Sequence, residues 1–196
     1  SLAAMRLLPD ALRISGGSVE VAGQDLFGLS EARMQEVRGR RVAMIFQNAM
    51  SALNPVQTVG KQVAETLQLH TRLRGAALRD RVVTLFREVG IPDPEQRFDF
   101  FPHQLSGGQQ QRVMIAMALA CEPDVLIADE PTTALDVTIQ LQVLNLIREL
   151  TRSRQLAVLL ITHDMGVVKN TADEVAVMYR GELIERASVD DFFQHP

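Results

Sequence analysis

The chain has 196 residues, with 20 Lys and Arg against 24 Asp and Glu and a formal net charge of -4. This balance excludes a protein that binds nucleic acid or anionic lipid by charge alone, and a hydrophobic fraction of 46% excludes global disorder. The single cysteine, Cys121, excludes an internal disulfide and a multi-cysteine zinc site, which favours a reducing, cytosolic setting. The longest apolar stretch, 156–162, is far shorter than the roughly 20 residues of a membrane-spanning helix.

The first part of the chain predicts one helix and two strands. Residues 1–8 are apolar and compatible with a helix that stops before Pro9. Residues 18–21 alternate as a short strand between glycines, and residues 41–46 predict a second strand that is apolar on both faces.

The pattern changes between residues 55 and 101. Residues 59–69 and 76–89 carry the apolar spacing of helices, and no strand-like segment separates them. We interpret this region as a helical insert in an α/β body.

Strand-like and helix-like segments alternate again in the rest of the chain, as is typical of an α/β fold. The predicted elements are a helix over 107–120, a buried parallel strand over 125–128, an amphipathic helix over 137–152, a second buried strand over 157–161, and a hairpin of 174–179 with 182–187.

Two acidic residues, Asp129 and Glu130, directly follow the strand predicted over 125–128. Open α/β sheets bind ligands at the carboxyl ends of their strands. In phosphoryl-transfer proteins, one carboxylate there holds Mg²⁺ and a neighbouring one can act on the attacking water. A turn-capping Asp129 and a solvated Glu130 explain this pair equally well when it is taken alone.

A serine and two glycines, Ser106, Gly107 and Gly108, stand before Gln109 at the start of a predicted helix. Uncovered backbone N–H groups and the positive end of the helix dipole suit a phosphate. Taken alone, the segment is explained more simply by an ordinary N-cap serine.

Three further polar residues lie at the ends of predicted elements. Gln47 follows the strand over 41–46, where an amide could contact a metal or water, although a surface amide is the simpler explanation. Asp136 precedes the helix over 137–152, where an N-cap explains it. His163 follows the strand over 157–161, and a lone histidine there is more often structural than catalytic.

The joint order of these segments resembles the ATP-binding subunit of ABC transporters, and the resemblance covers the whole chain. LSGGQQQR at 105–112 matches the family signature, and IADEPTTALD at 127–136 follows it. FQNAMSALNP at 46–55 and VMIAMAL at 113–119 are similar to the branch of oligopeptide, dipeptide and nickel importer ATPases.

The resemblance implies an α/β fold of the P-loop NTPase type, with a RecA-like core. Residues 1–196 would form a partial ABC nucleotide-binding domain, and about Asn48 to Cys121 would be a helical subdomain that docks a transmembrane permease. The implied assembly is a head-to-tail dimer with the same or a different ATPase chain, peripheral on the cytoplasmic face of the membrane. An extracytoplasmic solute-binding protein would act with it indirectly, and no nucleic acid is implied.

ATP and Mg²⁺ are the implied cofactors. By resemblance, Asp129 would coordinate Mg²⁺ through water, and Glu130 would be the general base that polarises the attacking water. His163 would hold the γ-phosphate and order both Glu130 and the partner subunit's Asp136, and Gln47 would reach Mg²⁺ and the water. The residues implied to contact ATP held by the opposite subunit are Ser106, Gly107, Gly108 and Gln109.

One family motif, G-x-x-x-x-G-K-[ST], is absent from the 196 residues. The resemblance implies that it lies a few residues upstream of Ser1, with an adenine-stacking aromatic further upstream, and that the family continues past residues 192–196. We therefore expect a fragment of a longer protein. Without the loop's backbone donors, lysine and Mg²⁺-binding hydroxyl, the chain by itself is expected to bind nucleotide very weakly and to lack ATPase activity.

The sequence thus predicts the ATP-hydrolysing subunit of an importer for peptides or a related small solute, nickel included. The alternative is a soluble ABC-type ATPase of translation or DNA repair. That class would need a second cassette, a coiled-coil arm or zinc-binding cysteines, and the interval from Gln47 to Ser106 is too short for such an arm. A catalytically inactive scaffold is disfavoured by the intact Asp129, Glu130 and His163.

Overall fold

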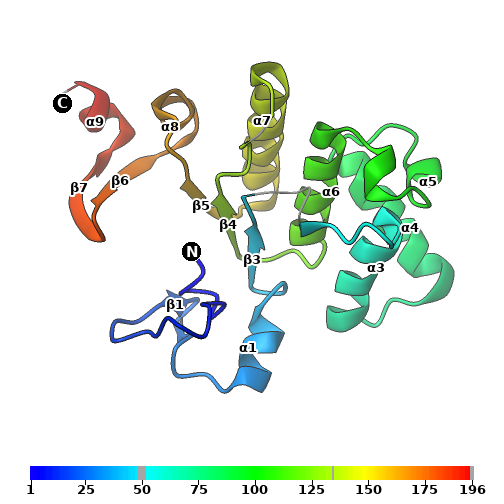
Figure 1. The fold of residues 1–196 in the computed structure, drawn as a ribbon, viewed down its shortest axis with the longest axis horizontal. Helices are drawn as coiled ribbons and strands as arrows, with labels where there is room; N and C mark the ends of the chain where they lie inside the picture. Colours follow the sequence, from blue (N-terminus) through cyan, green and yellow to red (C-terminus); the bar gives the residue numbers. More distant parts are fainter. Residues whose placement is uncertain (48–51, 134, 195–196) are drawn as a thin grey trace.

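The computed structural model describes residues 1–47, 52–133 and 135–194. Its central sheet consists of three parallel strands in the order β3 (Val42–Ile45), β4 (Val125–Asp129) and β5 (Ala157–Ile161). β3 and β4 lie side by side although a long helical region separates them in the chain (Figure 1). Parallel strands need such crossover connections, so the sheet confirms the α/β prediction.

Alternating side chains divide the central sheet between two hydrophobic clusters. Ala43 and Ile45 of β3, with Leu126 of β4, lie in a large cluster that the helices complete. Val42 and Met44 point the other way, into a smaller cluster near the N-terminus. Successive side chains of a strand point to opposite faces, so these strands are apolar throughout because both of their faces are covered.

The helical region lies at one end of the molecule (Figure 1). It consists of α3 (Val59–His70), α4 (Gly75–Glu88), α5 (Pro94–Arg97), the 3-10 helix η1 (Pro102–Gln104) and α6 (Gly107–Leu119). Helices predicted over 59–69, 76–89 and 107–120 are confirmed, and α5 was not predicted. Phe86 of α4 and Leu67 of α3 are fully buried in the large cluster. The expected start of the insert, Asn48, lies outside the described residues.

The remaining elements flank the sheet. They are β1 (Glu20–Val21), β2 (Gln24–Asp25) and α1 (Glu31–Val37) before it, and α7 (Val137–Arg154), α8 (Met165–Thr171), β6 (Glu174–Tyr179), β7 (Glu182–Ser188) and α9 (Val189–Gln194) after β4. The β6–β7 pair is antiparallel around Arg180 and Gly181, which confirms the predicted hairpin. Among the described residues, none of the helices combines the length and apolarity that a membrane span requires.

The helix predicted over residues 1–8 is wrong, because this segment forms turns. Met5 is buried in the smaller cluster, and Arg6 has a left-handed φ of 52°. The Arg38 side chain donates hydrogen bonds to the carbonyl oxygens of Met5 and Arg6 at 2.9 and 3.2 Å. A helix of two turns is marginal by itself, so these tertiary contacts decide the conformation.

Two strand predictions need correction. The strand expected over 18–21 is only Glu20–Val21, which pairs with β2 across a tight turn. β5 has the predicted bounds but is not buried, and Leu159 is 52% exposed. Among the described strands, β5 pairs with β4 alone, since β6 pairs with β7 instead. An edge position therefore leaves β5 partly open to solvent.

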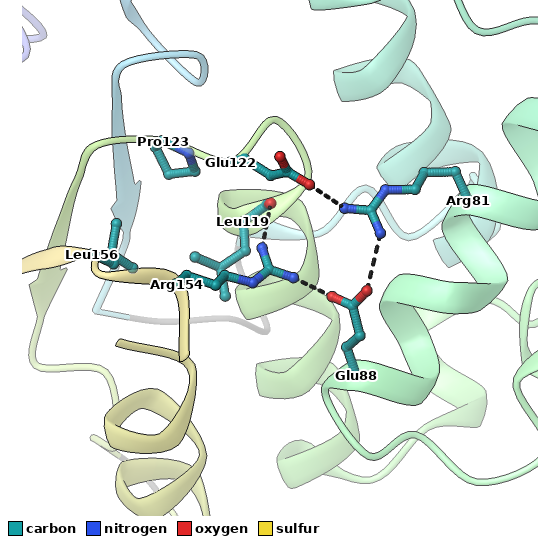
Figure 2. Close-up of a pocket in the computed structure, with 7 residues that line it drawn as sticks. All are labelled: Arg81, Glu88, Leu119, Glu122, Pro123, Arg154 and Leu156. Atoms are coloured by element: carbon teal, nitrogen blue, oxygen red, sulfur yellow. Dashed lines mark hydrogen bonds and ion pairs between the residues drawn. The ribbon is translucent and has the colours of Figure 1, made fainter. Parts of the chain in front are cut away.

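A chain of ionic contacts joins the helical region to the sheet layer around a cavity of about 320 Å³ (Figure 2). Glu88 at the end of α4 contacts Arg154 at the end of α7, and its other oxygen accepts from Arg81 at 3.0 Å. Arg81 reaches on to Glu122 at 3.0 Å, and Arg154 donates to the carbonyl oxygen of Leu119 at 3.2 Å. These contacts tie together the ends of α4, α6 and α7.

Candidate active site

The carboxyl ends of the three parallel strands bring together Gln47, Glu130 and His163, which follow β3, β4 and β5. The Gln47 amide nitrogen, Nε2, donates to Glu130 Oε2 at 2.7 Å. His163 Nδ1 lies 3.2 Å from Glu130 Oε1. Gln47 and His163, which lie far apart in the sequence, therefore both contact the carboxylate of Glu130.

Thr133 is a fourth member of this cluster and was not among the site residues predicted from the sequence. Its hydroxyl, Oγ1, donates to Glu130 Oε2 at 2.9 Å, and its backbone N–H donates to the Glu130 carbonyl at 3.2 Å. Pro131 stands at the second position of this four-residue turn, a favoured place for proline. A threonine at the close of a proline turn that begins with an acidic residue is the signal that could have revealed it.

The backbone of Glu130 is strained. Its φ of 45° is in the left-handed region, which costs a residue with a side chain about 1–3 kcal/mol. The Glu130 N–H donates to the Ile161 carbonyl of β5 at 2.9 Å, and this bond holds the conformation at the end of the sheet. Such strain is concentrated at functional sites.

Hydrogen bonds from Thr133, His163 and Gln47 lower the pKa of Glu130 below its ordinary value. The Glu130 side chain is only 25% exposed, whereas the His163 side chain is 80% exposed. Glu130 is therefore an oriented anion at neutral pH, as a base that accepts a proton must be. With Nδ1 of His163 at Glu130, Nε2 is the ring nitrogen that remains for another partner.

Asp129, the last residue of β4, lies beside this cluster. Its Oδ2 accepts a hydrogen bond from Ser1 Oγ at 2.5 Å, so the start of the chain reaches the same edge of the sheet (Figure 1). No three acidic, His or Cys side chains converge as a metal cage in the ranges that the structure describes. Mg²⁺ usually takes one or two carboxylates together with waters and substrate phosphates, and Asp129 with the Gln47 amide oxygen fits that donor set.

The second group of predicted residues lies at the starts of α6 and α7. Ser106 caps α6: its hydroxyl accepts from Gln109 N at 3.3 Å, and Gln109 Oε1 accepts from Ser106 N at 3.1 Å. Asp136 caps α7 by accepting from Ile139 N at 3.0 Å. Both N-cap explanations are confirmed. Within the described part of the chain, no hydrogen bond joins this group to Glu130.

Gly107 and Gly108, the first two residues of α6, face the start of α7. A Cβ at Gly108 would stand 2.7 Å from Ile139 Cγ2, whereas one at Gly107 would stand 3.6 Å from Leu135 Cδ2. The close approach of the two helices therefore requires a glycine at position 108 but not at position 107.

Residues 4–133 match the family model described as ABC transporter. A probable peptide ABC transporter ATP-binding protein, y4tR of Sinorhizobium fredii, is 52% identical over 100% of this chain and 59% of its own length. The oligopeptide transport ATP-binding protein OppD of Bacillus subtilis is 50% identical over 100% of this chain and 55% of its own length. The chain thus spans somewhat more than half the length of these curated relatives.

The fold has close counterparts among solved structures. The ATP-binding cassette MJ0796, as a dimer in a post-hydrolysis state bound to ADP and Pi, superposes with a TM-score of 0.79. Sequence identity is 27%, and the superposition covers 89% of this chain and 74% of that chain. This likeness confirms the predicted P-loop NTPase fold of the ATP-binding cassette type. On the family match and the relatives' identity over its whole length, the chain belongs to the ABC transporter ATPase family.

Proposed function

We propose that the full-length gene product is the ATP-binding and ATP-hydrolysing subunit that powers an importer for peptides or a related small solute, nickel included. The observation that carries this proposal is the Glu130 carboxylate, held by side chains from the ends of all three parallel strands. The similarity to ATP-binding proteins named for peptide and oligopeptide transport favours transport over a soluble ATPase of translation or DNA repair.

The proposed chemistry is attack of water on the γ-phosphorus of ATP, which breaks its bond to the β-phosphate oxygen and releases ADP and inorganic phosphate. Mg²⁺, when bound, neutralises charge on the phosphates. Asp129 would hold the ion through water, and the Gln47 amide oxygen, at the same edge of the sheet, would be a second ligand. Glu130 takes the proton from the attacking water, since its carboxylate is anionic and fixed in direction. His163 presents Nε2 to the γ-phosphate while Nδ1 stays on Glu130.

The proposed assembly is a head-to-tail dimer with a second ATPase subunit, on the cytoplasmic face of the membrane. Ser106 and Asp136 are exposed, and Gly107 and Gly108 begin α6, where the first N–H groups of a helix favour an anion such as the phosphates of ATP held by the other subunit. The residues proposed for that contact are Ser106, Gly107, Gly108, Gln109 and Asp136. Residues from about 48 to 121 would form the helical subdomain that docks a permease, with a solute-binding protein acting indirectly.

Glu130→Gln in the full-length gene product tests this proposal. The amide keeps the shape of the side chain but cannot accept the proton, so ATP turnover should be abolished while ATP binding remains. We expect the variant to accumulate as an ATP-bound dimer, seen by size-exclusion chromatography with ATP and Mg²⁺.

The matched control is Glu149→Gln, which changes an exposed glutamate near the far end of α7. It should hydrolyse ATP at the wild-type rate. The proposal fails if the wild-type protein does not hydrolyse ATP, or if Glu130→Gln hydrolyses it as fast as the wild type.

A further inference from the structure

Thr133 differs from the other two hydrogen-bond partners of Glu130 in its place in the fold. Gln47 and His163 follow other strands, and both are exposed at the edge where a nucleotide would lie. Thr133 belongs to the same four-residue turn as Glu130 and is joined to it twice, through backbone and side chain. Thr133 therefore moves with Glu130, whereas the other two partners need not.

The two oxygens of Glu130 are divided among these partners. Oε2 accepts from both Thr133 and Gln47, at 2.9 and 2.7 Å, and Oε1 lies 3.2 Å from His163. In the proposed function His163 keeps Nδ1 on Oε1 while Nε2 meets the phosphate, and Gln47 turns its amide oxygen toward Mg²⁺. Thr133 is then the partner of Oε2 that has no second ligand to serve, so its hydroxyl fixes the direction of the carboxylate toward the water.

Packing does not explain the Thr133 side chain, which is exposed while Pro131 in the same turn is buried. The turn itself needs only the backbone bond from Thr133 to the Glu130 carbonyl, which any residue with an N–H would supply. Among the residues that the structure describes, the bond to Glu130 is the one hydrogen bond of the Thr133 hydroxyl. The left-handed backbone of Glu130 makes such a bond useful, because it restrains a side chain on a strained residue.

We infer that Thr133 is a positioning residue for ATP hydrolysis, its hydroxyl holding the Glu130 carboxylate in the direction that activates water. This inference rests on the proposed function, in which Glu130 is the base. Thr133 would touch neither ATP nor Mg²⁺ and would act only through Glu130.

The test uses Thr133→Val, an isosteric change that removes the hydroxyl, in the full-length gene product. Loss of a hydrogen bond to a charged group predicts a fall in kcat of about tenfold or more. The KM for ATP should stay within about twofold, because the hydroxyl does not contact the nucleotide. Thr133→Ser keeps the hydroxyl and should retain the wild-type kcat. Thr133→Ala is the second variant should valine disturb folding, which a thermal unfolding curve would reveal.

Combining Thr133→Val with Glu130→Gln shows whether the threonine acts through the glutamate. Residues that act as a unit are not additive, so in single-turnover measurements with excess enzyme the residual rate of the double variant should equal that of Glu130→Gln alone. The inference is overturned if Thr133→Val leaves kcat unchanged, if the serine variant is equally impaired, if the KM alone changes, or if the double variant loses a further tenfold. When the wild type is active and Glu130→Gln is not, such an outcome overturns the role of Thr133 alone. An inactive wild type overturns the proposed function and this role together.

Discussion

At the scale of single residues, Gly108 shows that a glycine proposed to contact ATP can also be required by packing. A methyl group there would meet Ile139 Cγ2 at 2.7 Å, and the branched Ile139 side chain is stiff about χ1 and cannot turn away freely. Overpacking costs about 1–3 kcal/mol, against at most about 1 kcal/mol gained from alanine's better helix propensity. Gly108→Ala should therefore lower the free energy of unfolding, measured in urea, by up to about 2 kcal/mol.

Gly107→Ala is the matched control for this substitution. Its added methyl would stand 3.6 Å from Leu135, which is ordinary van der Waals contact. The control should leave the free energy of unfolding unchanged or slightly raised. Equal losses in the two variants would show that α6 and α7 do not approach as closely at position 108 as described.

At the scale of secondary-structure elements, the ion pairs drawn in Figure 2 join the helical region to the sheet layer. Glu88 is at their centre, because one carboxylate serves both Arg81 and Arg154, whose side chains are only 24% and 22% exposed. Glu88→Gln leaves two partly buried guanidinium groups without their shared anion. We expect the free energy of unfolding to fall by about 1.5–3 kcal/mol.

Glu122→Gln provides the comparison, since it removes only the outermost ion pair of the series, the one with Arg81. The Glu122 side chain is 73% exposed, and an exposed ion pair contributes at most about 1 kcal/mol. Urea unfolding of both full-length variants measures the difference. If Glu88→Gln lowered the free energy of unfolding no more than Glu122→Gln does, these ion pairs would not stabilise the junction between α4 and α7.

At the scale of the whole molecule, the separation of the two groups of site residues predicts an assembly. Ser106 caps α6 in an exposed position and makes no hydrogen bond to the Glu130 cluster among the residues described. Ser106→Arg should therefore weaken ATP-dependent dimerisation in the Glu130→Gln background while leaving ATP binding by the monomer unchanged. The bulky side chain would block close approach of a second subunit to the start of α6. Size-exclusion chromatography and calorimetry of the same samples measure these two quantities.

Two variants separate steric block from loss of the cap. Ser106→Ala removes the capping hydroxyl, at a cost of about 1 kcal/mol in stability, but adds no bulk and should preserve more of the dimer. Ser153→Arg places the same side chain at an exposed serine at the far end of α7 and should have no effect on dimerisation. A collapse of monomer ATP affinity in Ser106→Arg would show that this segment binds nucleotide within its own subunit.

The elements whose pattern is local were predictable from the sequence. Strands β3 and β4 read as apolar on both faces, and α3, α4, α6 and α7 carry a clear helical period, so their bounds agree to within about two residues. Acidic, amide and imidazole residues that follow parallel strands must meet at one edge of the sheet. The sequence alone therefore determined that Gln47, Glu130 and His163 each follow a strand, and the family resemblance indicated that they act at one site.

Tertiary structure decided the rest, because it depends on partners far away in the chain. Residues 1–8 lose their predicted helix to the Arg38 side chain, and β5 is exposed because strand pairing, not composition, sets which strand lies at an edge. Thr133 was not predicted because a threonine in a turn has no periodic signal. Its inferred role depends on the direction of one hydroxyl, which the strained backbone of Glu130 and the turn at Pro131 set together.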